Sequence, residues 1–76
     1  MAYFKVGSKV KVHPDNDNEC YDSFRGKILI VTHVARSKDD HPGYDSGIGE
    51  PLYDMKIDKT GKSVPCSLYH YELVRA

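Results

Sequence analysis

Histidine and cysteine are the side chains of this sequence best suited to bind a metal ion. They occur at His13, Cys20, His33, His41, Cys66 and His70. A zinc site is usually signalled by close pairs such as Cys-x-x-Cys or His-x-x-x-His, and the sequence contains no such pair. These side chains are therefore expected to line strands or to face solvent. The sequence predicts neither a metal site nor a cofactor.

Carboxylates and nucleophiles give no stronger signal for chemistry. Asp15, Asp17 and Glu19 alternate as the ligands of a calcium loop do, but the glycine at the sixth loop position and the distal bidentate glutamate are missing. The sequence also contains no Gly-x-Ser-x-Gly nucleophile elbow and no phosphate-binding P-loop. Cys66 is interpreted as a small core residue. The chain is therefore predicted to be non-enzymatic.

Tyrosine is the residue type that points most clearly to a function. The chain has six Tyr, two Phe and no Trp, and tyrosine offers a large contact area at little entropic cost. The candidate ligand-binding residues are Tyr21, Phe24, Tyr44, Tyr69 and Tyr71. Polar neighbours suggest that Tyr21 and Tyr44 are the most exposed of these. The alternative is that Phe24, Tyr53 and one of the two C-terminal tyrosines simply fill the core.

Acidic and basic residues balance at eleven each, so the formal net charge is zero. A non-specific nucleic-acid binder normally carries a basic surplus, because its affinity comes from neutralising phosphates. A local basic patch remains open as an alternative, with the candidate residues Lys9, Lys11, Arg25 and Lys27. The acidic residues between positions 15 and 22 would instead steer a basic protein partner to this part of the chain.

Five short strands are predicted to position these side chains within one domain that spans residues 1–76. Alternating or β-branched residues predict the strands at 9–13, 27–34, 52–57, 63–66 and 71–75. Residues 58–62 form a tight hairpin and residues 67–70 a single 3₁₀ turn. The loop at 36–50 is long, polar and glycine-containing, so we expect it to be the most mobile internal segment. No window has helical periodicity, and the fold class is therefore all-β.

The predicted core follows from the apolar faces of these strands. In the second strand, Ile28, Ile30 and Val34 are expected to face one side. Leu29 and Val31 are expected to face the other. The predicted core residues are Val10, Val12, Ile28, Ile30, Val34, Met55, Ile57, Val64 and Leu73.

Two local motifs resemble those of SH3-like small β-barrels. The run Gly-Lys-Ser-Val-Pro-Cys-Ser-Leu-Tyr at 61–69 is similar to the end of signalling SH3 domains. Residues 6–12 together with 24–28 are similar to the opening of KOW-type ribosomal and transcription modules. The resemblance implies a five-stranded SH3-like barrel with two long loops and a 3₁₀ turn before the last strand. It also implies that the two loops and the turn rim one face.

The sequence therefore predicts a protein–protein interaction module that uses a tyrosine-rich loop face. The alternative is a KOW- or Tudor-like nucleic-acid-binding module that uses the basic residues of the first two strands. The longest apolar run, residues 28–31, is too short to span a membrane, and the N-terminus lacks the apolar stretch of a signal peptide. A cytoplasmic, monomeric protein with reduced cysteines is expected.

Overall fold

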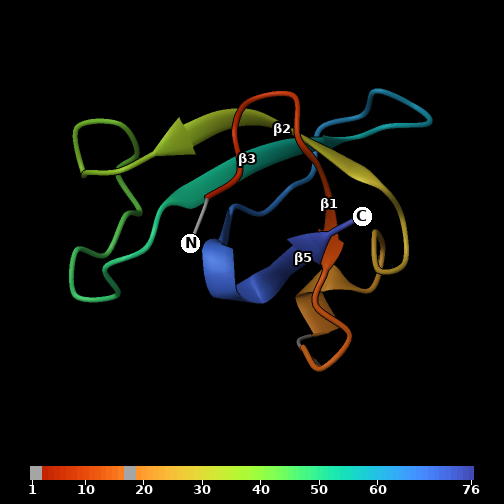
Figure 1. Ribbon diagram of the computed structural model, residues 1–76, viewed down its shortest axis with the longest axis horizontal. Coiled ribbons are helices and arrows are strands. Elements are labelled where there is room, and N and C mark those ends of the chain that lie inside the picture. Colours follow the sequence, from red (N-terminus) through yellow and green to blue (C-terminus); the bar gives the residue numbers. More distant parts are fainter. Residues whose placement is uncertain (1–2, 17–18) are drawn as a thin grey trace.

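A computed structural model describes residues 3–16 and 19–76 of the chain as a small all-β fold (Figure 1). Asp17 and the first two residues, named above for the calcium loop and the signal peptide, lie outside these ranges. The elements are β1 (Lys9–Val12), η1 (Glu19–Tyr21), β2 (Leu29–Ala35), β3 (Leu52–Ile57), β4 (Leu68–Tyr69), η2 (His70–Glu72) and β5 (Leu73–Arg75), where η marks a 3₁₀ helix. Within the described ranges, no helix is long and apolar enough to cross a membrane.

The five strands form one antiparallel sheet in the order β4-β3-β2-β1-β5. The two edge strands, β4 and β5, are consecutive in the chain and are separated only by η2 (Figure 1). The chain therefore passes from one edge of the sheet to the other through a single 3₁₀ turn. The sheet is open, because β4 and β5 form no ladder with each other in the described part of the chain. The all-β, five-stranded prediction is confirmed at this level.

β1 follows the alternation of its sequence, Lys-Val-Lys-Val. Both lysines face solvent and both valines are buried. The valines thus remove apolar area from water while the lysines keep their charges solvated. β1 pairs with β2 on one side and with β5 on the other, where Val12 lies opposite Leu73. The first strand is therefore as predicted, and it holds the C-terminal strand in place.

β2 presents the opposite face to the core from the one predicted. Leu29 and Val31 are fully buried, whereas Ile28 is 46% exposed and Ile30 is half-buried. The cause is the pairing with β1, in which Leu29 lies opposite the buried Val10. Residues that lie opposite each other in a ladder share a face, so a one-residue shift in the pairing moves the side chains of a strand to the other face of the sheet. The assignment of Ile28 to the core is wrong.

The core consists of two clusters that share the sheet. The main cluster is rich in aromatic rings and contains Phe4, Val10, Val12, Tyr21, Phe24, Leu29, Val31, Tyr53, Met55, Leu68 and Leu73. Val34, Ile57 and Val64 pack against it only partly buried. The second cluster contains Ala35, Tyr44 and Leu52, with Tyr69 packed against it. Four predicted core residues, Val10, Val12, Met55 and Leu73, are thus confirmed as buried.

The segment between β3 and β4 also differs from the prediction of a strand at 63–66. Only Ser63 forms an isolated bridge there, to Lys56. The N–H of Val64 donates to the Met55 carbonyl (2.9 Å), and no strand continues through Pro65. The strand forms later, as β4, and the 3₁₀ turn follows as η2, still before the last strand. The preceding hairpin turn is as predicted, with Gly61 at a φ of 73°.

Candidate binding site

The five aromatic candidates divide into buried and accessible residues. Tyr21 and Tyr44 are each only 8% exposed, so the prediction that they are the exposed pair is wrong. Tyr21 and Phe24 belong to the main core. Tyr44 packs against Ala35 and Leu52 in the second cluster. Each polar loop has few other apolar groups to bury, so its aromatic rings turn inward and hold the loop against the sheet.

The Glu72 carboxylate connects η2 to the first long loop, which joins β1 to β2. It accepts hydrogen bonds from the Tyr21 hydroxyl (2.7 Å) and from the backbone N–H of Tyr69 (3.0 Å). The side-chain amide of Asn16 donates a third, at 3.4 Å. Burial and the bond to this carboxylate raise the pKa of Tyr21, because both disfavour a phenolate at that position. Tyr21 is therefore a neutral donor that fixes the loop.

Tyr44, Tyr69 and Tyr71 form a row that runs from the interior to the surface. The ring centroids of Tyr44 and Tyr69 are 6.3 Å apart. Those of Tyr69 and Tyr71 are 6.2 Å apart, with the ring planes stacked at 8°. The Tyr69 hydroxyl also accepts the N–H of Asp45 (2.9 Å). Tyr71 is 59% exposed, so it offers an accessible aromatic surface, and the Tyr69 ring beneath it is held in place by Tyr44 and Asp45.

A pocket of about 360 Å³ beside this row is lined by His13, Asp15, Asn16, Tyr71 and Glu72. His13 Nδ1 accepts the N–H of Asp15 (3.0 Å) and lies 3.9 Å from the Asp15 carboxylate. Partial burial raises the pKa of Tyr71, and so, in decreasing order, do the neighbouring Glu72, Tyr69 and Glu50. The surroundings of Tyr71 are therefore acidic. The surface formed by His13, Asp15, Tyr69, Tyr71 and Glu72 is here called the tyrosine face.

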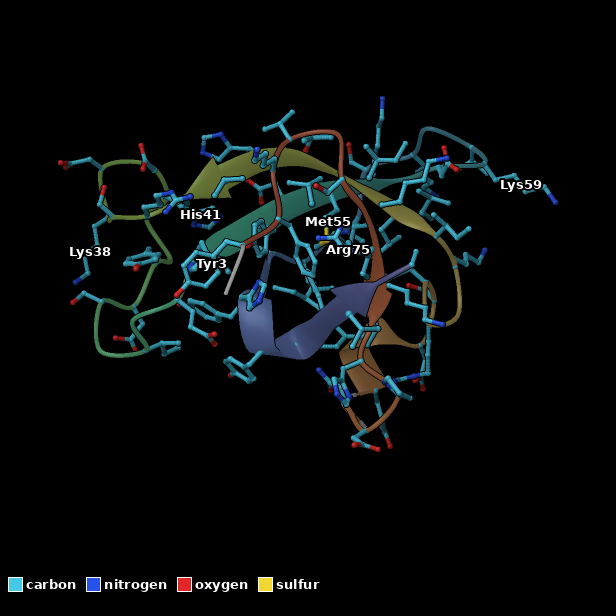
Figure 2. The ribbon with its side chains drawn as sticks, in the orientation of Figure 1. Tyr3, Lys38, His41, Met55, Lys59 and Arg75 are labelled. Atoms are coloured by element: carbon cyan, nitrogen blue, oxygen red, sulfur yellow. The ribbon has the colours of Figure 1, made fainter. Side chains whose placement is uncertain are left out.

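His41, Asp54 and Ser67 form a polar cluster that the sequence reasoning missed. The Ser67 hydroxyl donates to the Asp54 carboxylate and lies 3.1 Å from His41 Nε2. His41 Nδ1 accepts the N–H of Gly43 (3.0 Å), so in the neutral ring the proton sits on Nε2 and points towards Ser67. His41 is then a donor here, not the base that a serine nucleophile needs. The cluster fastens the middle loop, near His41 in Figure 2, to β3.

Tyr53 is a buried residue whose hydroxyl group contacts both the N-terminal segment and η2. Its ring is fully buried, and its hydroxyl accepts the N–H of Phe4 (3.0 Å). The same hydroxyl lies within hydrogen-bond distance of His70 Nδ1, at 3.1 Å. Burial raises the pKa of Tyr53, so the group stays neutral. The Tyr3 ring meets His70 edge-on at 4.9 Å, and the N-terminal segment is thereby packed against η2.

Of the four basic candidates, Lys9 and Lys27 both lie near Asp58, whereas Arg25 is engaged within the first loop. Arg25 Nε donates to Asp22 (3.0 Å), and its Nη1 donates to the backbone carbonyl of Asn16, so this side chain braces the first loop. Lys9 and Lys11 project from the outer face of β1, and Lys9 Nζ lies 3.8 Å from the Asp58 carboxylate. Lys27 lies at the far end of the loop, beside the β3 hairpin.

Within the described residues, no group of three or more His, Cys, Asp or Glu side chains is arranged to hold a metal ion. Cys66 is a free thiol that packs half-buried against the main core, so it lies at the edge of the core and is not one of its buried residues. A scan against models of protein families and searches of curated proteins and of solved structures found no match to this chain. Its function must therefore be inferred from its own contacts and charges.

Proposed function

We propose that this chain is a non-enzymatic SH3-like binding module whose tyrosine face holds a basic segment of a partner protein. The observation that carries the proposal is the exposed Tyr71 ring, stacked on Tyr69 within an acidic surface. The order of the strands and the 3₁₀ turn between the two sheet edges support the SH3-like interpretation. In this proposal the module is a monomeric, cytoplasmic protein, and its curved open sheet is a variant of the SH3-like barrel in which η2 links the two edge strands.

The tyrosine face is suited to a partner because it is already ordered. Tyr69 is held by Tyr44, by the Asp45 N–H and through its own N–H by Glu72. A ring that is fixed before binding loses little entropy when a ligand packs on it. Preorganisation of this kind lowers the entropic cost of binding a partner segment.

The charge of the face selects a cationic ligand. Arg or Lys side chains stack on exposed tyrosine rings through cation–π attraction, for about 0.5–1 kcal/mol at an exposed site. The Asp15 carboxylate at the pocket beside Tyr71 adds a point of attraction that is almost fully solvated. Complementary charge mainly raises the rate of encounter and suppresses wrong partners. A segment in which a basic residue lies next to an apolar residue would therefore match both the acidic charge and the aromatic surface of the face.

Selection from a random peptide library tests this proposal. Peptides bound by the chain should be enriched in Arg or Lys, and their affinity is measured by fluorescence anisotropy. Tyr71→Ala should weaken binding by about 2 kcal/mol or more, roughly 30-fold. Val6→Ala, which truncates an exposed apolar residue elsewhere, is the matched control and should have no effect. Peptides that bind Tyr71→Ala as well as they bind the unchanged chain would refute the proposed face.

Nucleic-acid binding is the alternative, and the exposed Lys9 and Lys11 on β1 are what favour it. It draws less support from the contacts, since Arg25 is engaged by the first loop and Lys9 is close to a carboxylate. A Lys9→Glu/Lys11→Glu variant separates the two functions. It should keep its peptide affinity if the tyrosine face is the working surface. The alternative would be established if the unchanged chain bound an oligonucleotide with a steep dependence on salt and this variant no longer bound it.

A further inference from the structure

A second pocket lies away from the tyrosine face, where the first loop enters β2 and β3 ends in its hairpin. Its volume is about 590 Å³, and its walls include Lys27, Ile28, Ile57, Asp58 and Lys59. Figure 2 shows Lys59 at one end of the molecule, with Lys38 and His41 of the middle loop at the other. We call this site the hairpin-end pocket.

Apolar side chains form the floor of the hairpin-end pocket. Ile28 is 46% exposed and Ile57 is partly buried. Folding leaves Ile28 outside because its neighbour Leu29 occupies the core side of the strand. The N–H of Asp58 donates to the carbonyl of Ile28 (2.9 Å), so the two walls are joined by the backbone. An exposed β-branched side chain on a fixed wall is a surface that another apolar group can cover.

Positive charge surrounds this floor. The side chains of Lys27 and Lys59 are exposed, and neither forms an ion pair within the described ranges. The one carboxylate of the pocket, that of Asp58, lies 3.8 Å from Lys9 Nζ, which offsets its charge. The rim is therefore net cationic, in contrast to the acidic surroundings of Tyr71.

We propose that the hairpin-end pocket binds an acidic protein segment that carries an aliphatic side chain. The aliphatic group covers Ile28 and Ile57, and the flanking carboxylates face Lys27 and Lys59. Nucleic acid fits this site less well, because a phosphate backbone has no aliphatic group to cover the apolar floor. The chain would then bind a basic partner at the tyrosine face and an acidic partner at the hairpin-end pocket. This site is independent of the tyrosine face.

The probe for this site is a short fluorescein-labelled peptide with two central leucines flanked by aspartate and glutamate. Saturable binding is expected in fluorescence anisotropy. Ile28→Ser and the double variant Lys27→Glu/Lys59→Glu should each weaken it at least tenfold. Lys38→Glu, a charge reversal at an exposed lysine of the middle loop, and Tyr71→Ala should leave it unchanged. The Tyr71 result makes failure here distinguishable from failure of the tyrosine face.

Three outcomes would overturn the proposal. The first is absence of saturable binding. The second is equal binding of a peptide in which serine replaces both leucines, since attraction would then be purely electrostatic. The third is tighter binding of an oligonucleotide, or self-association in sedimentation that Ile28→Ser abolishes, because either assigns the pocket to another occupant. If Ile28→Ser does not fold by circular dichroism, the lysine double variant alone decides the result.

Discussion

Replacing Tyr53 by Phe tests whether a single buried hydroxyl holds the N-terminal segment and η2 together. The substitution keeps the ring but removes the acceptor of the Phe4 N–H and the hydrogen-bond partner of His70 Nδ1. A buried donor left without a partner costs about 1–3 kcal/mol. The half-buried His70 can turn to water, so we expect a loss of about 2 kcal/mol in the free energy of unfolding. For a domain of this size, that lowers the melting temperature by roughly 8–16 °C.

Urea unfolding followed by circular dichroism measures this loss, with amide exchange at Phe4 as a local readout. Tyr44→Phe is the matched control, since Tyr44 is also a buried tyrosine but its hydroxyl has no hydrogen-bond partner within the described residues. The control should change stability by less than about 0.5 kcal/mol. Equal effects of the two substitutions, or unchanged protection of the Phe4 amide in Tyr53→Phe, would refute the reasoning.

Three further predictions concern the strands, the pH and the middle loop. Leu29→Ala should cost about 2–5 kcal/mol in urea unfolding, whereas Ile28→Ala should cost less than about 1 kcal/mol, and the reverse order would mean that β2 faces the other way. Because folding raises the pKa of Tyr21, the unfolded chain loses that proton first, so the contribution of Tyr21 to stability should be constant below about pH 10 and fall above it. Tyr21→Phe should flatten the decline in alkaline denaturation. Amides of residues 38–49 should exchange fast except near the buried Tyr44, and strong protection throughout that loop would contradict this.

The strand content could be predicted from the sequence because alternation is a local signal. Lys-Val-Lys-Val in β1 has only one apolar face, so its orientation is specified by the residues themselves. β2 is apolar on both faces. Which face is turned to the core is decided by the pairing of Leu29 with Val10, a contact between distant parts of the chain. A β-bulge between Val31 and His33 shifts the register again within the same strand. Neither feature has a local sequence signature.

The candidate site could be predicted only in part. The position of Tyr71 next to the predicted 3₁₀ turn indicated a surface there, and the accessible ring does lie at η2. Polar neighbours misplaced Tyr21 and Tyr44, because the burial of a loop side chain depends on how the loop folds over the sheet. The cluster of His41, Asp54 and Ser67 joins residues too far apart in sequence to form a motif.

Chemical-shift mapping with a basic peptide selected by the chain tests the central claim most directly. The claim is that a cationic segment binds at the tyrosine face. In titrations of the isotopically labelled protein, the largest amide shifts should fall at residues 13–16 and 69–72, with smaller changes at 44–45. The same titration of Tyr71→Ala should show these shifts greatly reduced at equal peptide concentration. Largest shifts on the outer face of β1, or around residues 26–28 and 57–60, would contradict the claim.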